Sequence, residues 1–150
     1  VASPEDLPTL QDALKGAAAD GDKKVVEELA KWDAGLKLLE TCKADKACYM
    51  KTLQDANADW FAREKAAFEI ARLSPGDKAA AVEISKAFKV RNPDARVSMA
   101  LLVSRVLGNT KCPECAVALE DVMKGEKGSM DASMQLPVLT ARTTIARVSE

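Results

Sequence analysis

Two stretches decide the fold of this chain: REKAAFEIARL at residues 63–73 and RVSMALLVSRV at residues 96–106. Both follow the pattern R-x-x-x-A-x-x-x-x-R, and both have a β-branched aliphatic residue at the eighth position, Ile70 or Val103. The two copies start 33 residues apart, and a weaker third copy, RTTIA at residues 142–146, starts 46 residues after the second. Self-similarity at this distance is typical of proteins built from stacked helical hairpins.

The composition favours helices. Among the 150 residues there are 26 alanines, but only three isoleucines and one tyrosine. Alanine is the best helix former, whereas β-branched and aromatic residues favour strands. We therefore predict an all-α protein, and the length predicts a single domain over residues 1–150.

Capping and turn residues divide the chain into about eight helices. Gly35 weakens the pattern of the second helix, and Pro137 should kink the last helix or mark its true start. The loosest linker is the glycine-rich stretch 125–128. The predicted helices span residues 4–19, 23–41, 45–54, 59–73, 77–90, 94–107, 112–124 and 131–149.

Over residues 45–150 the sequence resembles the HEAT-repeat family. In that family the second helix of each antiparallel pair commonly starts with Asp, then Arg, then a run of alanine and aliphatic residues. The final unit departs from the pattern because of the glycine-rich insertion and Pro137. The matching residues are Asp59, Arg63, Ala66, Ala67, Ile70 and Ala71 in one unit and Asp94, Arg96, Met99, Ala100 and Val103 in the next.

The resemblance implies an α-solenoid of stacked antiparallel helical hairpins, with residues 1–44 as an N-terminal capping pair. It also implies a ladder of Asp–Arg contacts between neighbouring repeats, made by Asp59, Arg63, Asp94 and Arg96. The alternative for the arginines is that they are ordinary exposed residues of their helices, and a surface ion pair adds only about 0–1 kcal/mol.

Four cysteines form two local pairs, Cys42 with Cys48 and Cys112 with Cys115. We expect each pair to form a structural disulfide. The second pair is a C-x-x-C at a predicted helix start, where the helix dipole stabilises a thiolate, so redox activity is an alternative. Free thiols and metal binding remain further alternatives, although a zinc site from all four cysteines would need two distant segments to converge.

The charge and the missing histidine exclude several functions. Without histidine the chain has no Ser–His or Cys–His nucleophilic pair and no HExxH zinc site. We therefore expect no catalytic residues, no metal and no cofactor. The net charge of −1 lacks the basic excess typical of nucleic-acid binding.

The chain begins at Val1 rather than at Met, which indicates a mature chain or an excised piece from which any signal peptide has been removed. It contains no run of 18 apolar residues, so we expect no membrane span. The even number of paired cysteines favours an oxidising compartment: periplasmic, outer-membrane associated or secreted. A cytoplasmic location stays open.

The leading hypothesis for function is a non-enzymatic scaffold that binds a protein on the face lined by the second helices of the repeats. Trp60 and Phe61 are candidate anchors, because aromatic residues dominate binding hot spots, but they also fit a helix-capping or core role. The alternative function is thiol–disulfide exchange at Cys112 and Cys115. The remaining candidate contact residues, which solvation alone would also explain, are Glu64, Glu69, Arg72, Ser98 and Arg105.

Overall fold

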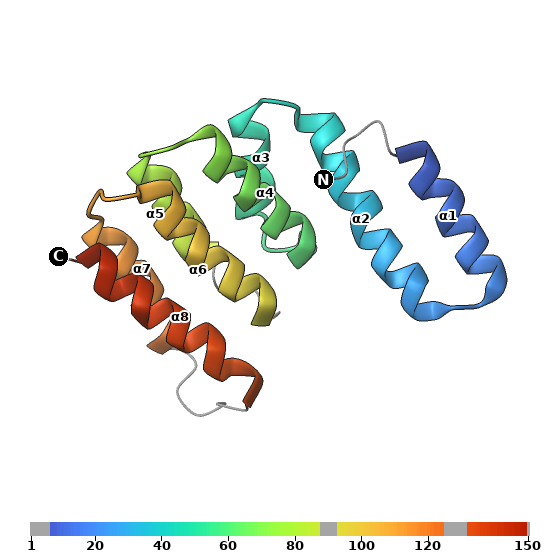
Figure 1. Ribbon diagram of the computed structural model, residues 1–150. Coiled ribbons are helices and arrows are strands. Elements are labelled where there is room, and N and C mark those ends of the chain that lie inside the picture. The colour runs from blue at the N-terminus through green and yellow to red at the C-terminus, as the bar shows by residue number, and fades with distance from the viewer. Residues whose placement is uncertain (1–6, 88–92, 125–131, 150) are drawn as a thin grey trace. The chain divides into compact units, whose positions relative to one another are not determined.

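The computed structural model describes residues 7–87, 93–124 and 132–149, with side chains over 7–87, 97–121 and 139–149. This part of the chain is entirely helical and contains no strand (Figure 1). Its helices are α1 (Leu7–Asp20), α2 (Lys23–Cys42), α3 (Lys46–Gln54), α4 (Trp60–Leu73), α5 (Lys78–Ala87), α6 (Pro93–Leu107), α7 (Pro113–Lys124) and α8 (Ala132–Ser149).

The all-α prediction is confirmed, and the helices begin and end close to the predicted positions. Gly35 does not interrupt α2. The helix is continuous over Lys23–Cys42, and Gly35 is buried within it. The alternative that Pro137 marks the start of the last helix is wrong, since α8 begins at Ala132. The predicted cap at residues 3–6, the end of the fifth helix at 88–90 and the linker at 125–128 lie outside the described residues.

The chain divides into two compact units, Val1–Asp45 and Lys46–Glu150. In the first unit α1 packs against α2. Asp22 caps α2, because its carboxylate accepts a hydrogen bond from the Val25 amide at 3.2 Å. Leu7 and Leu36 are buried in this hairpin, whereas Trp32 remains half exposed.

In the second unit each helix packs against the next helix in its pair: α3 on α4, α5 on α6 and α7 on α8. The first helices of the pairs contact one another in the order α3, α5, α7, and the second helices do so in the order α4, α6, α8. Figure 1 shows the second helices side by side. The middle helix of each series, α5 or α6, therefore has a neighbouring helix on either side.

Small residues occupy the contact positions of the second unit. Ala66 and Ala67 of α4, Ala81 of α5, Ala100 of α6 and Ala141 of α8 have no exposed surface. An alanine at such a position lets the helix axes approach closely, and larger side chains then fill the remaining space. The largest of these fully buried side chains are Tyr49, Leu53, Ile70, Ile84, Met99, Val103, Val106 and Leu119.

Two backbone hydrogen bonds close the second and third pairs. The Gly76 amide, just before α5, donates to the Val106 carbonyl near the end of α6 at 2.7 Å. The Cys112 amide, just before α7, donates to the Val148 carbonyl near the end of α8 at 2.8 Å. Because the start of each pair bonds to its end, the two helices of these pairs are antiparallel. Gly76 adopts φ +79°, a backbone conformation that glycine accepts without strain.

The third sequence copy does not share the burial of the first two. Ala67 and Ala100 are fully buried, but the corresponding Ala146 is exposed. The residues of α8 that are buried instead are Ala141, Thr144 and Val148. The Thr144 hydroxyl donates to the Ala100 carbonyl of α6 at 3.2 Å. The packing register of α8 therefore differs from the register that the RTTIA pattern predicts.

Candidate functional site

The candidate contact residues lie on the second helices. Glu64, Glu69 and Arg72 are on α4, and Ser98 and Arg105 are on α6. Arg72 and Arg105 are exposed, whereas Glu64 and Ser98 are half-buried. The structure therefore places these residues on two neighbouring helices that contact each other.

The Glu69 carboxylate interacts with two basic residues of its own helix. Its carboxylate accepts a hydrogen bond from Arg72 Nε at 2.9 Å and lies 3.9 Å from Lys65 Nζ, and only 12% of its side chain is exposed. Burial, and secondarily the Glu69 charge, raise the pKa of the Tyr49 hydroxyl on α3, while Arg72 opposes this effect. Glu69 is thus mostly buried and paired within its own helix, which leaves little of its side chain for an external partner.

Trp60 and Phe61 begin α4 as a packed aromatic pair. Their rings meet edge to face, with centroids 5.7 Å apart and planes at 84°. Asp59 caps the helix, since its carboxylate accepts a hydrogen bond from the Phe61 amide at 2.8 Å. Both aromatic side chains are half-buried, so each has an accessible part as well as a part in contact with the protein.

Arg63 binds the end of the preceding helix. Its Nε donates to the Leu53 carbonyl at 3.0 Å, which satisfies one of the carbonyls left without a partner at the end of α3. Burial lowers the pKa of the Arg63 guanidinium, and the nearby Asp55 carboxylate opposes the shift. The side chains of Asp94 and Arg96 lie outside the described residues, so the Asp–Arg ladder stays a prediction.

Two exposed apolar residues were not expected from the sequence. Phe68 on α4 is 39% exposed and Leu101 on α6 is 57% exposed. Each lies four residues, about one turn, before an arginine, Arg72 or Arg105, so the apolar residue and the arginine share a helix face. The sequence signal was available, because Phe68 and Leu101 occupy the same position of the repeat pattern.

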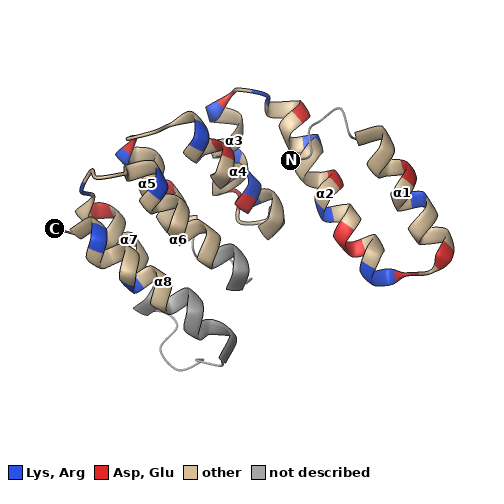
Figure 2. Cartoon of the chain, viewed as in Figure 1, with Lys and Arg blue, Asp and Glu red and all other residues tan. Residues whose placement is uncertain are grey.

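The second helices also share a basic last turn. Arg72, Arg105 and Arg147 lie in the last turns of α4, α6 and α8, and all three are exposed. Figure 2 shows where Lys and Arg residues lie along these helices. Arg147 was not among the expected contact residues, because in the third copy it aligns with Phe68 and Leu101 rather than with Arg72 and Arg105.

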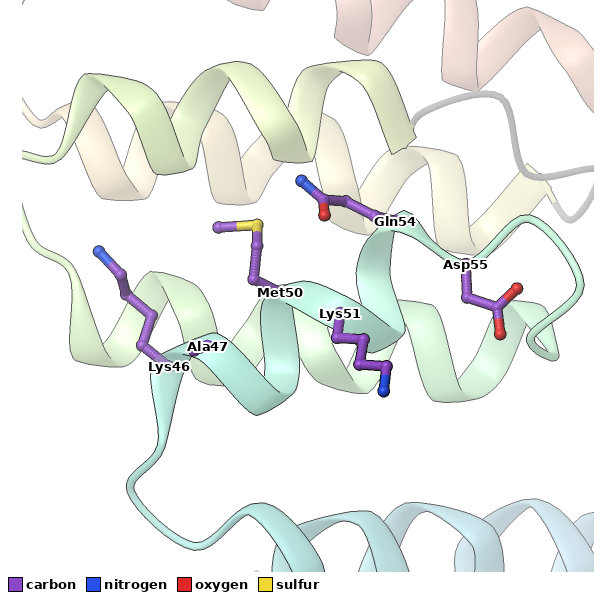
Figure 3. Close-up of a pocket in the computed structure, with 6 residues that line it drawn as sticks. All are labelled: Lys46, Ala47, Met50, Lys51, Gln54 and Asp55. Carbon is purple, nitrogen blue, oxygen red and sulfur yellow. The ribbon is translucent and has the colours of Figure 1, made fainter.

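A shallow depression of about 600 Å³ lies along α3 (Figure 3). Two contacts with α5 lie beside it: Lys46 Nζ donates to Asp77 at 2.7 Å, and the Gln54 amide donates to Glu83 at 2.8 Å. Lysine, alanine, methionine, glutamine and aspartate side chains line it, and none of them is a nucleophile beside a base. The lining residues are Lys46, Ala47, Met50, Lys51, Gln54 and Asp55.

The cysteines are oxidised. A disulfide joins Cys112 to Cys115, and both residues are fully buried. The Cys115 amide donates to the Cys112 sulfur at 3.2 Å, as expected at a helix N-terminus. Cys42 and Cys48 are disulfide-bonded as well, so none of the four cysteines, all within the described residues, is a free thiol.

Among the described residues no group of three or more Cys, Asp or Glu side chains is arranged to hold a metal ion. Within the same residues no helix is long and apolar enough to cross a membrane. Comparison with known proteins adds no family to these observations: no protein-family model, no curated protein and no solved structure matches this chain.

Proposed function

We propose that this chain is a non-enzymatic module that binds another protein through the outward face of α4, α6 and α8. The observation that carries the proposal is the repeated presence of a large exposed apolar residue, Phe68 or Leu101, beside an exposed arginine. Apolar and arginine side chains in one patch are typical of protein-binding surfaces. Two neighbouring helices present this same combination.

The proposal includes a HEAT-like α-solenoid over the second unit. It is supported by the shared R-x-x-x-A-x-x-x-x-R pattern and by helices that contact in two series, α3–α5–α7 and α4–α6–α8. Stacked hairpins present their second helices as one continuous surface, which suits an extended partner.

Photo-cross-linking tests the binding face. A photoreactive amino acid at Leu101 of α6 should form a discrete cross-linked product with a partner protein in an extract of the native source. The matched control is Val117 of α7, which is 55% exposed against 57% for Leu101 but lies on a first helix. Equal labelling from both positions, or none from Leu101, would contradict the proposal.

The alternative function is thiol–disulfide exchange at Cys112 and Cys115. A C-x-x-C at the start of a helix favours it, but the complete burial of both sulfurs opposes it, because exchange requires access to a sulfur atom. A measured reduction potential decides between the two. A value below about −300 mV is expected for a structural bond, and a value near that of thioredoxin, about −270 mV or higher, would support exchange.

We also propose an extracytoplasmic location, which the two disulfides support. Alkylation of the chain directly in intact native cells tests this. Four blocked, unreactive cysteines are expected, whereas four alkylated thiols would contradict the location.

A further inference from the structure

We propose that the face of α4, α6 and α8 binds an acidic, extended segment of its partner, with carboxylates at every third residue opposite Arg72, Arg105 and Arg147. This inference rests on the proposed function, to which it adds the chemistry and the conformation of the partner. Three features support it. The three arginines lie at the same ends of their helices, basic side chains predominate around them, and their helices pack at a regular distance.

The three arginines lie at one edge of the helix layer. The loop after α4 reaches the end of α6, because the Gly76 amide bonds to the Val106 carbonyl at 2.7 Å. The loop after α6 reaches the end of α8 in the same way, through Cys112 and Val148 at 2.8 Å. The last turns of the three helices are therefore neighbours, and the exposed arginines of these turns form a row, called here the arginine row.

Basic side chains outnumber acidic ones around the arginine row, where the acidic side chains are Glu69 of α4 and Glu114 in the first turn of α7. The described side chains of α6 and α8, over residues 97–107 and 139–149, include no aspartate or glutamate, but they include Arg105, Arg142 and Arg147. Lys111 adds a further charge, since its Nζ donates to the Arg147 carbonyl at 3.0 Å. The whole chain nevertheless has a net charge of −1, so this edge is basic against the overall balance.

Two of the three arginines are available to a carboxylate. Arg72 is paired with Glu69 at 2.9 Å. Arg105 and Arg147 form no ion pair with any side chain that the structure describes. A guanidinium binds a carboxylate through two parallel hydrogen bonds, which a lysine cannot do. The charge and the residue type thus both select an acidic partner.

The spacing of the row selects the conformation of the partner. Packed helices lie about 8–10 Å apart, so neighbouring arginines start from points separated by about that distance. A polyproline-II segment rises about 3.1 Å per residue with three residues per turn, so every third side chain returns to the same face after about 9 Å. An acidic residue at every third position therefore meets successive arginines.

The apolar residues define the rest of the contact. Phe68 and Leu101 lie one helical turn before Arg72 and Arg105, and Thr143 takes the corresponding position before Arg147. A partner that places its carboxylates on the arginine row brings its intervening residues close to Phe68 and Leu101. We therefore expect apolar residues between the acidic ones.

Fluorescence anisotropy with the full chain tests this inference. The probe is a dansyl-labelled peptide of four Glu-Leu-Pro repeats, and the matched control peptide has the same composition with its glutamates in one block. We expect the periodic peptide to bind at least about fivefold more tightly and to lose affinity as salt rises. Equal binding of the two peptides would overturn the periodic contact.

Charge reversal locates the site. Arg105→Glu and Arg147→Glu should each weaken binding of the periodic peptide by about five- to tenfold. The matched control is Lys51→Glu, which changes an exposed lysine in the last turn of α3, at the opposite edge, and should leave binding within twofold. Circular dichroism verifies that each variant is folded. A loss as large in Lys51→Glu would overturn the assignment to the arginine row.

Other anionic macromolecules provide the decisive comparison. Tighter binding of phosphatidylglycerol vesicles or of a single-stranded oligonucleotide than of the periodic peptide would overturn the inference in favour of that class. The outcome is separable from that of the proposed function. If Leu101 cross-links to a partner but the acidic peptide does not bind, the binding face stands and the acidic partner is wrong.

Discussion

The two units of the chain differ in how many of their described apolar side chains are fully buried. In the first unit Leu7 and Leu36 are buried, while Val25 and Trp32 are 42% and 50% exposed. In the second unit Ile70, Ile84 and many other apolar side chains have no exposed surface. Both units consist of helices, so the difference does not come from the type of secondary structure.

The number of packed neighbours explains it. Within the first unit each of the two helices packs against one other helix, α1 against α2. In the second unit α6 contacts α4, α5 and α8, so it is covered on several sides. Repeat proteins gain stability in this way, from the interfaces between units as well as from the units themselves.

The largest expected effect is the loss of a core side chain in the second unit. Ile84→Ala should lower the free energy of unfolding by about 2–5 kcal/mol, because Ile84 is fully buried and its removal leaves a cavity. Trp32→Ala, in the first unit, should cost much less, because Trp32 is 50% exposed. Chemical denaturation measures both, and equal losses would contradict the difference in packing between the units.

The disulfides give the next largest effect. Replacing Cys112 and Cys115 by alanine should lower the free energy of unfolding by about 2 kcal/mol, because the bond restricts the unfolded chain. The bond should also resist reduction in the folded protein, since both sulfurs are buried, whereas Cys48 is only half-buried. Native-state reduction followed by alkylation and mass spectrometry should therefore label Cys48 first. Earlier labelling of Cys112 or Cys115 would show that the core of the second unit opens more easily than its packing implies.

The capping aspartates of the two units should differ by a smaller amount in their contribution to the free energy of unfolding. Asp77 caps α5 by accepting from the Ala80 amide at 3.1 Å and also binds Lys46 at 2.7 Å, whereas the Asp22 carboxylate accepts from an amide in α2. Asp77→Ala should cost about 1–2 kcal/mol and Asp22→Ala about 0.5–1 kcal/mol. Thermal or chemical denaturation at neutral pH measures both, and a larger loss for Asp22→Ala would contradict the contribution of Lys46.

The Asp77 effect should depend on pH. The hydrogen bond from Lys46, followed by that from the Ala80 amide, lowers the pKa of the Asp77 carboxyl. The ionised carboxylate therefore stabilises the fold above the unfolded-state pKa, about 3.9, and this stabilisation is lost as the pH falls through the lower folded-state pKa. The difference between the native chain and Asp77→Asn should shrink on acidification to about pH 2. A difference that grows on acidification would contradict it.

The smallest expected effect concerns a buried hydroxyl in the second unit. The Ser74 hydroxyl, at the end of α4, is buried and has no hydrogen-bond partner among the described residues. Its burial without a partner is unfavourable, so Ser74→Ala should raise the free energy of unfolding by about 0–1 kcal/mol. A clear loss of stability on denaturation would show that the hydroxyl has a partner in solution.

The helices were predictable because the sequence marks their ends. Asp22, Asp59 and Asp77 each cap a helix, and Gly21 and Gly108 adopt a positive φ directly after a helix end. In α4 and α6 the periodic alanines also mark the buried face, since Ala67 and Ala100 are fully buried. These signals depend only on residues close together in the sequence, so they do not require knowledge of the tertiary packing.

The surface was less predictable. Leu101 lies in the most hydrophobic stretch of the chain, so hydrophobicity alone places it inside, yet it is 57% exposed. The Arg63 side chain binds the Leu53 carbonyl at the end of α3, a contact that the repeat pattern does not indicate. The register of α8 depends on contacts with α6, such as that of Thr144 with Ala100, and no local pattern records such contacts.

The two backbone bonds that join the start of a hairpin to its end have a consequence for how such a chain grows. Gly76 and Val106 belong to one pair of helices, and Cys112 and Val148 belong to the next. A duplicated or deleted pair would bring or remove its own bond and leave the bond of its neighbour intact. Adding or removing one whole hairpin therefore preserves the closing bond of the other.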